Sequence, residues 1–578
     1  MVQSGIIQFL KKKRFQGLNQ VELCNELNIN ANKKTRYDRL DVAQKVVNIK
    51  SVLKKTNNKS EAARVSGVPR RTARYWLDRE GITGLSPEVE LFFESPPGMA
   101  FLHQLFIAAQ FTITQLSPCG VDILAKFLHL SQLDKLVASS HGTLHKQSMQ
   151  MEAVINQFGD LEGKKLALKM PKKKITLCED ETFHPEICLV AMEPVSNFIL
   201  LEAYSERRDG DSWSAAIKEA LTDLPVDVIQ ATSDGGTGLI KHVEQSLQAH
   251  HSPDLFHVQQ DLTRATSAPI NAKVKQAEKT YETSKKVLEK LMKKQEKEYK
   301  IRETPDLCAE LDKEIILEEM VAEAALIRLN ELKKHQEDIK ESKKALGAVY
   351  HPYDLETGAP QTAEVVGEKM EAHYATIQTI ADNADLSDNS MCRLEKAHRV
   401  FKGMIHTIAF FCSFVAQHIA TIGLTPEMES IMRDILIPAL YLKVASKKAK
   451  KAKERHRLAK LSKELLARLE LIDGWGMLTD STKDQMRTIA KDCANVFQRS
   501  SSCVEGRNGY LSLRHHGSHQ LSKRKLKALT VIHNYFIQRS DQTTAAERFF
   551  ESKPRNLFEF LLDQLDVSAR PAKSRRVN

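Results

Sequence analysis

Two stretches decide the fold expected for this chain: Ile175-Thr-Leu-Cys-Glu-Asp180 and Val226-Asp-Val-Ile-Gln-Ala-Thr-Ser-Asp234. Each is a short apolar run with the composition of a β-strand, and each ends on an aspartate. Gly235 and Gly236 follow the second run directly. Two carboxylates at neighbouring strand ends can bind a divalent metal ion, so Asp180 and Asp234 are the first candidate site residues.

The residues around these runs extend the pattern. Further elements are predicted as strands at 187–192 and 197–204, a helix from Ser212, a helix at 237–249 and a strand at Asp254-Leu-Phe-His-Val258. The expected order is therefore β-β-β-α-β-α-β. A generic doubly wound domain would alternate helices and strands from its start, so the three leading strands argue against one.

The positive charge of the chain is concentrated at its N-terminus. The 578 residues carry a formal net charge of +11. Residues 1–80 contain 18 Lys and Arg against 7 Asp and Glu, which accounts for all of that charge. This distribution is typical of a nucleic-acid-binding module joined to a near-neutral body, and a solvated basic tail is the alternative.

Within the basic region, the segment from Lys59 to Leu77 has the pattern of a helix-turn-helix. Small residues for close helix contact, a glycine for the turn and a proline for the next helix follow in order: Ala62, Ala63, Gly67 and Pro69. The second helix would present Arg70, Arg71 and Arg74 to DNA. A purely structural helical pair is the alternative.

The chain beyond the strands is expected to be helical. From Val274 to about Ala345, apolar residues recur at spacings of three and four, and Thr304-Pro305 interrupts the run. This pattern predicts an antiparallel helical hairpin, with pairing between molecules as the alternative. A basic stretch from Lys447 to Lys463 either contacts DNA phosphates or forms a solvated helix face.

Cysteine usage and hydropathy indicate in which cellular compartment the protein is expected. Nine cysteines without CxxC spacing predict a reducing compartment and no disulfide framework. Cys178, His184 and Cys188 are interpreted as buried structural residues in preference to a zinc site. No run of 18 apolar residues and no signal-peptide pattern occur, so a soluble intracellular protein without a membrane partner is expected.

Three passages resemble the catalytic motifs of DDE transposases of the bacterial insertion-sequence type. They are Glu179-Asp-Glu-Thr-Phe-His184, Thr232-Ser-Asp-Gly-Gly236 and Ser502-Cys-Val-Glu-Gly-Arg-Asn-Gly509, and Asp254-Leu-Phe-His257 resembles a further stretch of those enzymes. The resemblance implies an α/β RNase H-like core of the retroviral-integrase type. A large helical, coiled-coil-containing insertion would interrupt this core, and an all-α helix-turn-helix region would precede it.

The resemblance also implies a chemistry and partners. Asp180 would bridge two Mg²⁺ ions, which Mn²⁺ can replace, while Asp234 and Glu505 would each complete one metal site. Water would first expose a 3′-OH at the transposon end, and that hydroxyl would then attack target DNA. Residues after the glutamate would contact the DNA end: Arg507, Asn508 and Arg514. The expected partners are double-stranded DNA and further copies of the chain, as a homodimer or higher oligomer, in a prokaryotic cytoplasm at the nucleoid.

Seven segments make up the expected domain organisation. They are 1–94 (helix-turn-helix), 95–165 (helical connector), 166–265 (first part of the core), 266–348 (helical hairpin), 349–495 (helical insertion), 496–550 (closing part of the core) and 551–578 (C-terminal helix and basic tail).

Some of these assignments have alternatives. Glu179 and Glu181 flank Asp180, but strand alternation turns them to the opposite face, and Asp180 is preferred because it is shorter and ends its strand. Glu505 precedes two glycines, which are poor helix residues, whereas the family places this glutamate on a helix. Glu244 and Glu395 are its alternatives.

Three other functions stay open beside an active transposase. They are an RNase H-like nuclease without strand transfer, a catalytically inactive DNA-binding regulator descended from a transposase, and a coiled-coil scaffold. A joined DNA product would separate the first of these from a transposase. The scaffold explains 274–345 but leaves the two aspartates unexplained.

Overall fold

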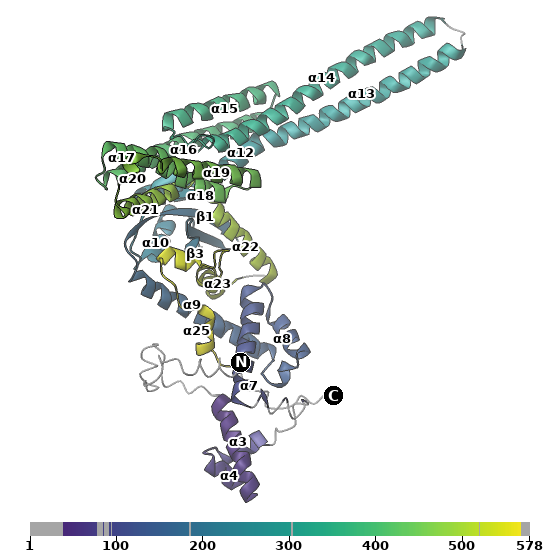
Figure 1. Ribbon diagram of the computed structural model, residues 1–578. Helices are drawn as coiled ribbons and strands as arrows, with labels where there is room; N and C mark the ends of the chain where they lie inside the picture. The colour runs from purple at the N-terminus through teal and green to yellow at the C-terminus, as the bar shows by residue number, and fades with distance from the viewer. Residues whose placement is uncertain are drawn as a thin grey trace. The chain divides into compact units, whose positions relative to one another are not determined.

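The computed structural model describes residues 39–77, 95–183, 186–301, 305–518 and 521–567, with a few single residues between 85 and 93. The chain divides into two compact units. Unit 1 comprises Met1–Met170 and Gly509–Asn578, and unit 2 comprises Pro171–Asn508. Unit 1 is therefore built from both ends of the sequence, as the purple and yellow segments of Figure 1 indicate.

The N-terminal part of unit 1 is a small three-helix module, and its last two helices confirm the helical pair predicted from Lys59 to Leu77. It contains α3 (Arg39–Thr56), α4 (Lys59–Val65) and α5 (Arg70–Leu77). The Asn58 side chain caps α4 by accepting from the backbone N–H groups of Ser60 and Glu61. Gly67 has φ +65°, a conformation that favours glycine, and it turns the chain between α4 and α5. Buried small and branched residues form the core: Ile49, Ala62, Ala63, Val68 and Ala73.

The rest of unit 1 joins an early helical segment to the C-terminal helices. The early elements are α7 (Pro96–Gln110), η2 (Phe111–Leu116), α8 (Val121–Leu130), η3 (Leu133–Lys135) and α9 (His141–Ala167). The late elements are α23 (Lys523–Tyr535), α24 (Ala545–Phe550) and α25 (Leu557–Gln564). Phe158 of α9 contacts Tyr535 and Phe560 edge-on, with ring centroids 5.6 and 5.3 Å away. The two segments therefore share one core.

Unit 2 contains a single five-stranded mixed sheet with the order β3-β2-β1-β4-β5. Its elements follow along the chain as β1 (Lys173–Phe183), β2 (Ile187–Glu193), β3 (Phe198–Ser205), α10 (Gly210–Leu221), β4 (Val226–Ser233), α11 (Thr237–Lys241), η4 (His242–Ser246) and β5 (His250–Pro253). β1, β2 and β3 pair antiparallel, whereas β4 is parallel to β1 and β5 is parallel to β4.

The predicted fold class is wrong for this chain. The protein is 72% helical, and its few strands form one small mixed sheet, which fits poorly with an α/β RNase H-like core. The predicted α/β core depends on the strand signals between residues 175 and 258 and on the resemblance of three passages to transposase motifs. Helices account for most of the remaining residues, so they determine the class.

The strand predicted at Asp254–Val258 is also wrong, because this segment begins a helix. β5 ends at Pro253, and α12 covers Leu255–Leu262. The Asp254 carboxylate accepts from the backbone N–H of Phe256, an N-cap that favours helix over strand. The buried residues of α12 are spaced for one helical face: Leu255, Val258 and Leu262.

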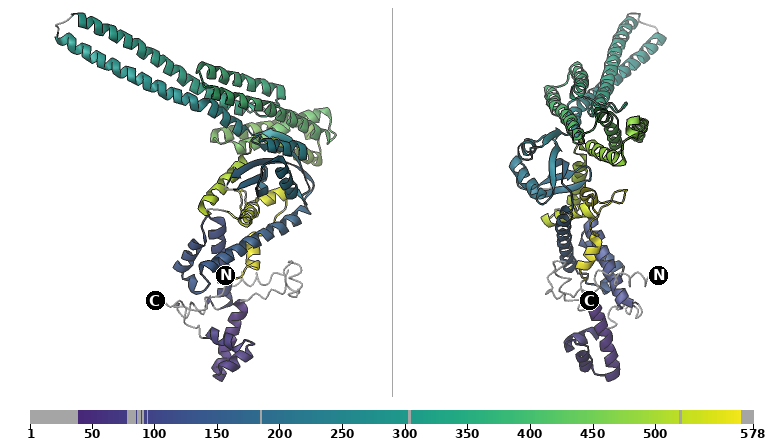
Figure 2. Two further views of the ribbon diagram at one scale, coloured as in Figure 1. Left: turned by 180° about the vertical axis from the view of Figure 1, so that it is seen from behind. Right: turned by 60° about the vertical axis from the view of Figure 1, so that its left-hand side comes forward.

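A long helical hairpin confirms the prediction for residues 266–348. After η5 (Thr263–Ser267), α13 (Ala268–Ile301) and α14 (Pro305–Val349) run antiparallel, and Figure 2 shows them projecting from the other helices of unit 2. Pairs across the hairpin fix its register. Gln336 donates to Asn271 (2.7 Å), and Lys333 lies 2.9 Å from Glu278.

The remaining helices of unit 2 enclose its largest apolar core. They are α15 (Ala363–Asn383), α16 (Asp388–Ala420), α17 (Pro426–Ile431), η6 (Met432–Leu436), α18 (Ile437–Lys448), α19 (Ala452–Leu469), α20 (Asp473–Gly476), α21 (Asp480–Val496) and the start of α22 (Ser502–Ser518). In the described part of the chain, α16 alone is long and apolar enough to cross a membrane by length and composition. Its buried face, from Leu394 to Ile419, packs into the core of unit 2.

Candidate active site

Asp180 and Asp234 lie at the same level of the sheet. β1 and β4 pair in parallel up to Cys178 and Thr232, and each aspartate lies two residues beyond. β4 ends at Ser233, whereas β1 continues in antiparallel pairing with β2. The prediction that Asp180 ends its strand is therefore wrong. Asp180 lies inside β1, at a level where β4 has ended and no longer pairs with β1.

Strand alternation separates Asp180 from its two acidic neighbours. The Glu181 carboxylate accepts a hydrogen bond from the indole Nε1 of Trp213 on α10 (3.1 Å). Glu179 is fully buried, with its Oε1 3.6 Å from Nε2 of His242. Asp180 is instead hydrogen-bonded to α22. Glu179 and Glu181 thus belong to the α10 side of the sheet, and Asp180 to the α22 side.

The turn after β4 orients Asp234. Gly235 has φ +82°, which favours glycine, and the N–H of Gly236 donates to Asp234 Oδ1 (2.9 Å). Asp234 is exposed at this turn. The preceding Ser233 hydroxyl lies 2.9 Å from Nε2 of His251, whose pKa is lowered to about 4 by burial. The imidazole beside Asp234 is therefore neutral at physiological pH.

Glu505 lies in the first turn of α22, so the two following glycines do not prevent a helix. The start of this helix is held against α12. Asp254 accepts hydrogen bonds from the hydroxyl of Ser501 and from its backbone N–H (3.1 Å). The backbone N–H of Leu255 donates to the carbonyl of Arg499 (2.9 Å). Asp254 thus caps α12 and anchors the start of the helix that carries Glu505.

His257 contacts this glutamate from α12. Its Nε2 lies 3.4 Å from Glu505 Oε1 and 4.0 Å from Asp254 Oδ2. The imidazole is partly exposed, and the Glu505 side chain is 38% exposed. His257 was expected on the strand predicted at Asp254–Val258. The helical turn places it beside the candidate site instead.

The charges of two predicted catalytic carboxylates act on the third. The pKa of Asp180 is raised from 3.8 to about 6, mainly by burial and also by the negative charges of Glu505 and Asp234. A hydrogen bond from the backbone N–H of Glu181 and the charge of His257 oppose this shift. Residues from three distant parts of the sequence therefore share one electrostatic environment.

The side chains around Asp180 fit a hard cation in donor type. No group of three or more His, Cys, Asp or Glu in the described ranges is already arranged to hold a metal ion. However, Asn508 Nδ2 donates to Asp180 Oδ2 (2.8 Å), and Asn508 Oδ1 is buried without a hydrogen-bond partner among the described residues. Carboxylate and amide oxygens are ligands that Mg²⁺ accepts. A cation would also relieve the repulsion between the carboxylates.

Two of the arginines predicted to contact DNA are buried. The guanidinium of Arg507 forms a bidentate pair with Glu202, with both N–O distances 2.6 Å and side-chain exposures of 4% and 0%. Arg514 is 3% exposed and donates to the backbone carbonyls of residues 115–117. Burial of both guanidinium groups argues against direct DNA contact, and Asn508 is hydrogen-bonded to Asp180.

Most of the remaining residues singled out in the sequence lie on other elements of the structure. Arg70, Arg71 and Arg74 are exposed on α5. The alternatives to Glu505 lie on other elements, Glu244 exposed on η4 and Glu395 on α16, 3.7 Å from Arg399. Of the three residues interpreted as structural, Cys178 and Cys188 are buried, and His184 lies outside the described residues.

Sequence reasoning missed two residues that organise this region. Glu202, the partner of Arg507, is a carboxylate within an otherwise apolar predicted strand, a position that implies a buried cation. Ser501, which binds Asp254, is one of several serines before α22 and carries no distinguishing signal in sequence.

One match to a known family was found, and it covers the C-terminal quarter of the chain. Residues 432–577 match a family described as "Family of unknown function (DUF6399)". That range includes Glu505 and all of α22 but neither aspartate. No curated protein and no solved structure matches the chain.

Proposed function

We propose that this chain is a DDE-type transposase, which cleaves DNA strands at transposon ends and joins them to target DNA with the help of divalent metal ions. One observation carries the proposal. Asp234 lies level with Asp180 in the sheet, and the negative charges of Asp234 and Glu505 both raise the pKa of Asp180. Carboxylate clusters of this kind are a means of binding the metal ions that act on phosphodiesters.

Each residue near the site has a distinct role in this proposal. Asp180 would bind both ions, and Asp234 and Glu505 would each bind one. When bound, the two ions would activate a water or 3′-hydroxyl and stabilise charge on the leaving oxygen. Asn508 holds the Asp180 carboxylate through Oδ2. His257 is placed to orient Glu505.

Two basic surfaces favour double-stranded DNA as the substrate. One is α5, with its three exposed arginines. The other is the turn between α18 and α19, where Lys450 and Lys451 are exposed and Arg455 donates to two backbone carbonyls of the turn. Just before this turn, Lys448 donates to Gln498 Oε1 (2.9 Å) in the segment leading to α22. Phosphates bound at the turn would lie near that segment.

The test is cleavage of DNA duplexes that carry the sequences flanking the gene, in Mg²⁺ or Mn²⁺. Wild type should cleave and produce joined strands, because strand transfer follows exposure of the 3′-OH. Asp180→Asn, Asp234→Asn and Glu505→Gln should each lose at least about three orders of magnitude in rate, since metal ions supply several kcal/mol of barrier reduction. DNA binding by the three variants should be unchanged.

Glu395→Gln is the matched control, because it neutralises an exposed glutamate on α16 that was an alternative to Glu505. It should cleave as wild type does. A second readout does not depend on activity: Mg²⁺ should raise the melting temperature of wild type but not of Asp180→Asn. Full cleavage by Asp234→Asn would refute the metal assignment. Cleavage without joined products would leave a nuclease.

A catalytically inactive DNA-binding regulator is the second candidate function. The observation that favours it is that the described carboxylates are not already arranged as a metal-binding group. Such a protein would use α5 and the α18–α19 turn in the same way. Tight binding to the flanking DNA by wild type, with no cleavage and no stabilisation by Mg²⁺ or Mn²⁺, would identify it. Either protein would act at the nucleoid, in the cytoplasm of a prokaryote.

A further inference from the structure

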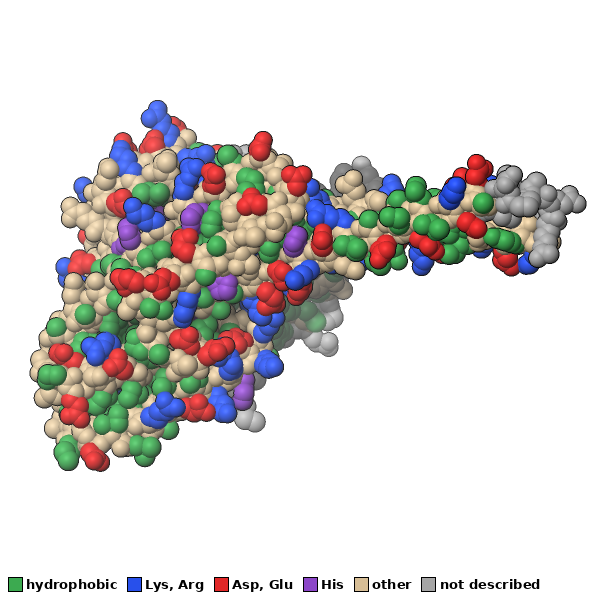
Figure 3. Space-filling view, turned by 90° about the horizontal axis from the view of Figure 1, so that it is seen from above, with side chains coloured by type: hydrophobic (Ala, Val, Ile, Leu, Met, Phe, Trp, Pro, Cys, Tyr) green, Lys and Arg blue, Asp and Glu red, His purple; other side chains and the backbone are tan. Residues whose placement is uncertain are grey.

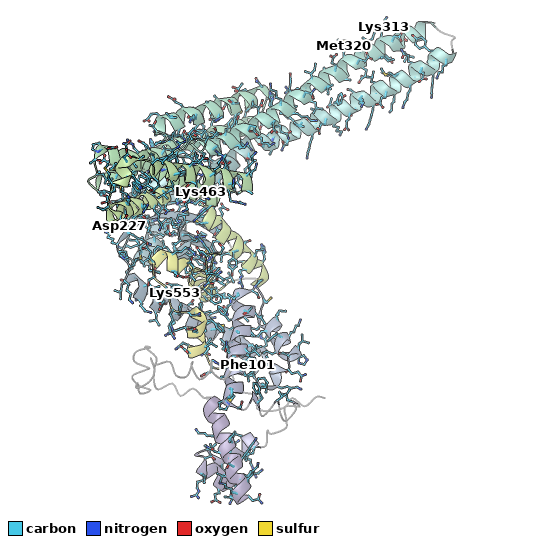
Figure 4. All side chains as sticks on the ribbon, viewed as in Figure 1. Phe101, Asp227, Lys313, Met320, Lys463 and Lys553 are labelled. Carbon is cyan, nitrogen blue, oxygen red and sulfur yellow. The ribbon has the colours of Figure 1, made fainter. Side chains whose placement is uncertain are left out.

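In the projecting part of the hairpin, α14 carries a row of apolar side chains on its solvent-facing side, which is called the apolar stripe. α14 uses one row of buried side chains within the hairpin: Leu311, Ile315, Ala322 and Leu329. A second row faces solvent, with Leu317 68% exposed, Met320 65% and Ile327 53%. Together with Ala324, this row has the three-and-four spacing of a coiled-coil seam. Figure 4 labels Met320 in this projecting part, and Figure 3 shows apolar side chains on its surface.

The two helices of this part carry opposite charge. Residues 285–300 of α13 contain seven lysines against three glutamates, and residues 310–328 of α14 contain six acidic residues against two basic ones. Within the described ranges, Lys300 is the one lysine of this α13 segment that forms an ion pair, and its partner is Glu296 of the same helix. Gln295 and Tyr299 contact Asp312 across the hairpin without ionic pairing. Much of the charge is therefore available to a partner.

We propose that a second copy of this chain covers the apolar stripe and that two hairpins pair as a two-fold symmetric four-helix bundle. The acidic α14 of one chain packs against the basic α13 of the other, and the symmetry repeats that contact. Each acidic helix then has a basic neighbour on both sides, while the second apolar row is buried. This proposal concerns assembly, and it does not depend on the chemistry at Asp180.

The first experiment measures the mass of the full-length chain by sedimentation equilibrium over a range of concentrations. Wild type should be a dimer. Leu317→Gln with Met320→Gln should weaken the dimer by at least about a hundredfold, because each buried apolar side chain contributes an order of magnitude or more. Helix content by circular dichroism should not change, since both side chains lie outside the hairpin's own core.

The matched control is Leu471→Gln with Met477→Gln. It changes the same residue types at 82% and 85% exposure, away from the hairpin. The control should remain a dimer. A monomeric wild type, or a dimer that survives the Leu317 and Met320 substitutions, would overturn the proposal.

Charge complementation tests which helices face each other. One variant reverses exposed lysines of α13 (Lys290→Glu, Lys293→Glu, Lys297→Glu), and another reverses exposed glutamates of α14 (Glu314→Lys, Glu319→Lys, Glu323→Lys). Each variant alone should be monomeric, because its helices would meet with like charge. An equimolar mixture should form a heterodimer that weakens as salt rises. A mixture that stays monomeric rules out the α13–α14 contact between chains.

Discussion

At the scale of single residues, Asp180 is held in an environment that disfavours its charge. Its carboxylate is mostly buried, its pKa is raised by the charges of Glu505 and Asp234, and it accepts hydrogen bonds from the Glu181 backbone N–H and from Asn508. Above this raised pKa the carboxylate is ionised in both the unfolded and the folded chain, and placing its charge in the folded environment costs free energy. The residue reduces stability in the metal-free protein, which is a common property of functional sites.

Asp180→Asn should stabilise the metal-free protein at neutral pH. The folded-state pKa of about 6 lies above the ordinary 3.8. The folded chain thus binds the proton more tightly, and wild type loses stability as pH rises from about 4 to about 6. At pH 7.5 the variant should gain roughly 1–3 kcal/mol, and the gain should vanish near pH 4. Urea unfolding in chelator at both pH values measures this.

Asp484→Asn is the control for that measurement, because its side chain is 75% exposed. It should change stability little at either pH. If Asp180→Asn were less stable than wild type at pH 7.5, the carboxylate would be favourably held, and the repulsion between the three carboxylates would be refuted.

The buried pair of Arg507 and Glu202 leads to a different prediction. Arg507→Ala should destabilise the protein by about 3–5 kcal/mol, because it leaves a buried carboxylate unpaired. Arg507→Met combined with Glu202→Leu should recover much of the loss, since both charges are then removed. Urea unfolding of the three proteins checks this. A loss under about 1 kcal/mol in Arg507→Ala would indicate an exposed arginine, free to contact DNA as the sequence suggested.

At the scale of elements, the sequence predicted repeating patterns well and helix starts poorly. The hairpin and the N-terminal helices were predicted because heptad spacing, glycine and proline positions are local signals. The Asp254 segment was predicted as a strand because its short apolar run has no clear period, and a side-chain cap decided it for helix. Glu505 was in doubt because of helix propensity, but packing at the start of α22 outweighs two glycines.

Helix α5, with its exposed arginines, is the element best suited to a test of DNA binding. Arg70→Ala with Arg71→Ala should weaken binding to the flanking DNA and lower the salt slope of log Kd by about 2, because two phosphate or base contacts are lost. Fluorescence anisotropy at several salt concentrations measures both. Lys285→Ala with Lys286→Ala, an exposed pair on α13, should leave binding unchanged. Unchanged affinity in the α5 variant would remove the helix-turn-helix from the mechanism.

At the scale of the whole molecule, the catalytic role of Asp180, Asp234 and Glu505 stays a prediction from motif order, whereas the predicted fold class is wrong. The charges of Glu505 and Asp234 do raise the pKa of Asp180, although the three residues come from distant parts of the sequence. The helices between Asp234 and Glu505 were predicted, but they were interpreted as an insertion into an α/β core, whereas helices make up most of the described chain. The burial of Arg507 and Arg514 depends on distant partners, Glu202 and the backbone carbonyls at the end of η2, which no local pattern reveals.

The discontinuity of unit 1 and the late position of Glu505 determine the order in which parts of the protein are completed during synthesis. At about 5–20 residues per second, a ribosome completes Glu505 roughly 10–60 seconds after Asp234. The module from α3 to α5 leaves the ribosome first, whereas α23 to α25, which complete unit 1, are made last. During synthesis the chain therefore has its helix-turn-helix before its third carboxylate. Any product whose translation stops within the hairpin remains permanently in that early state.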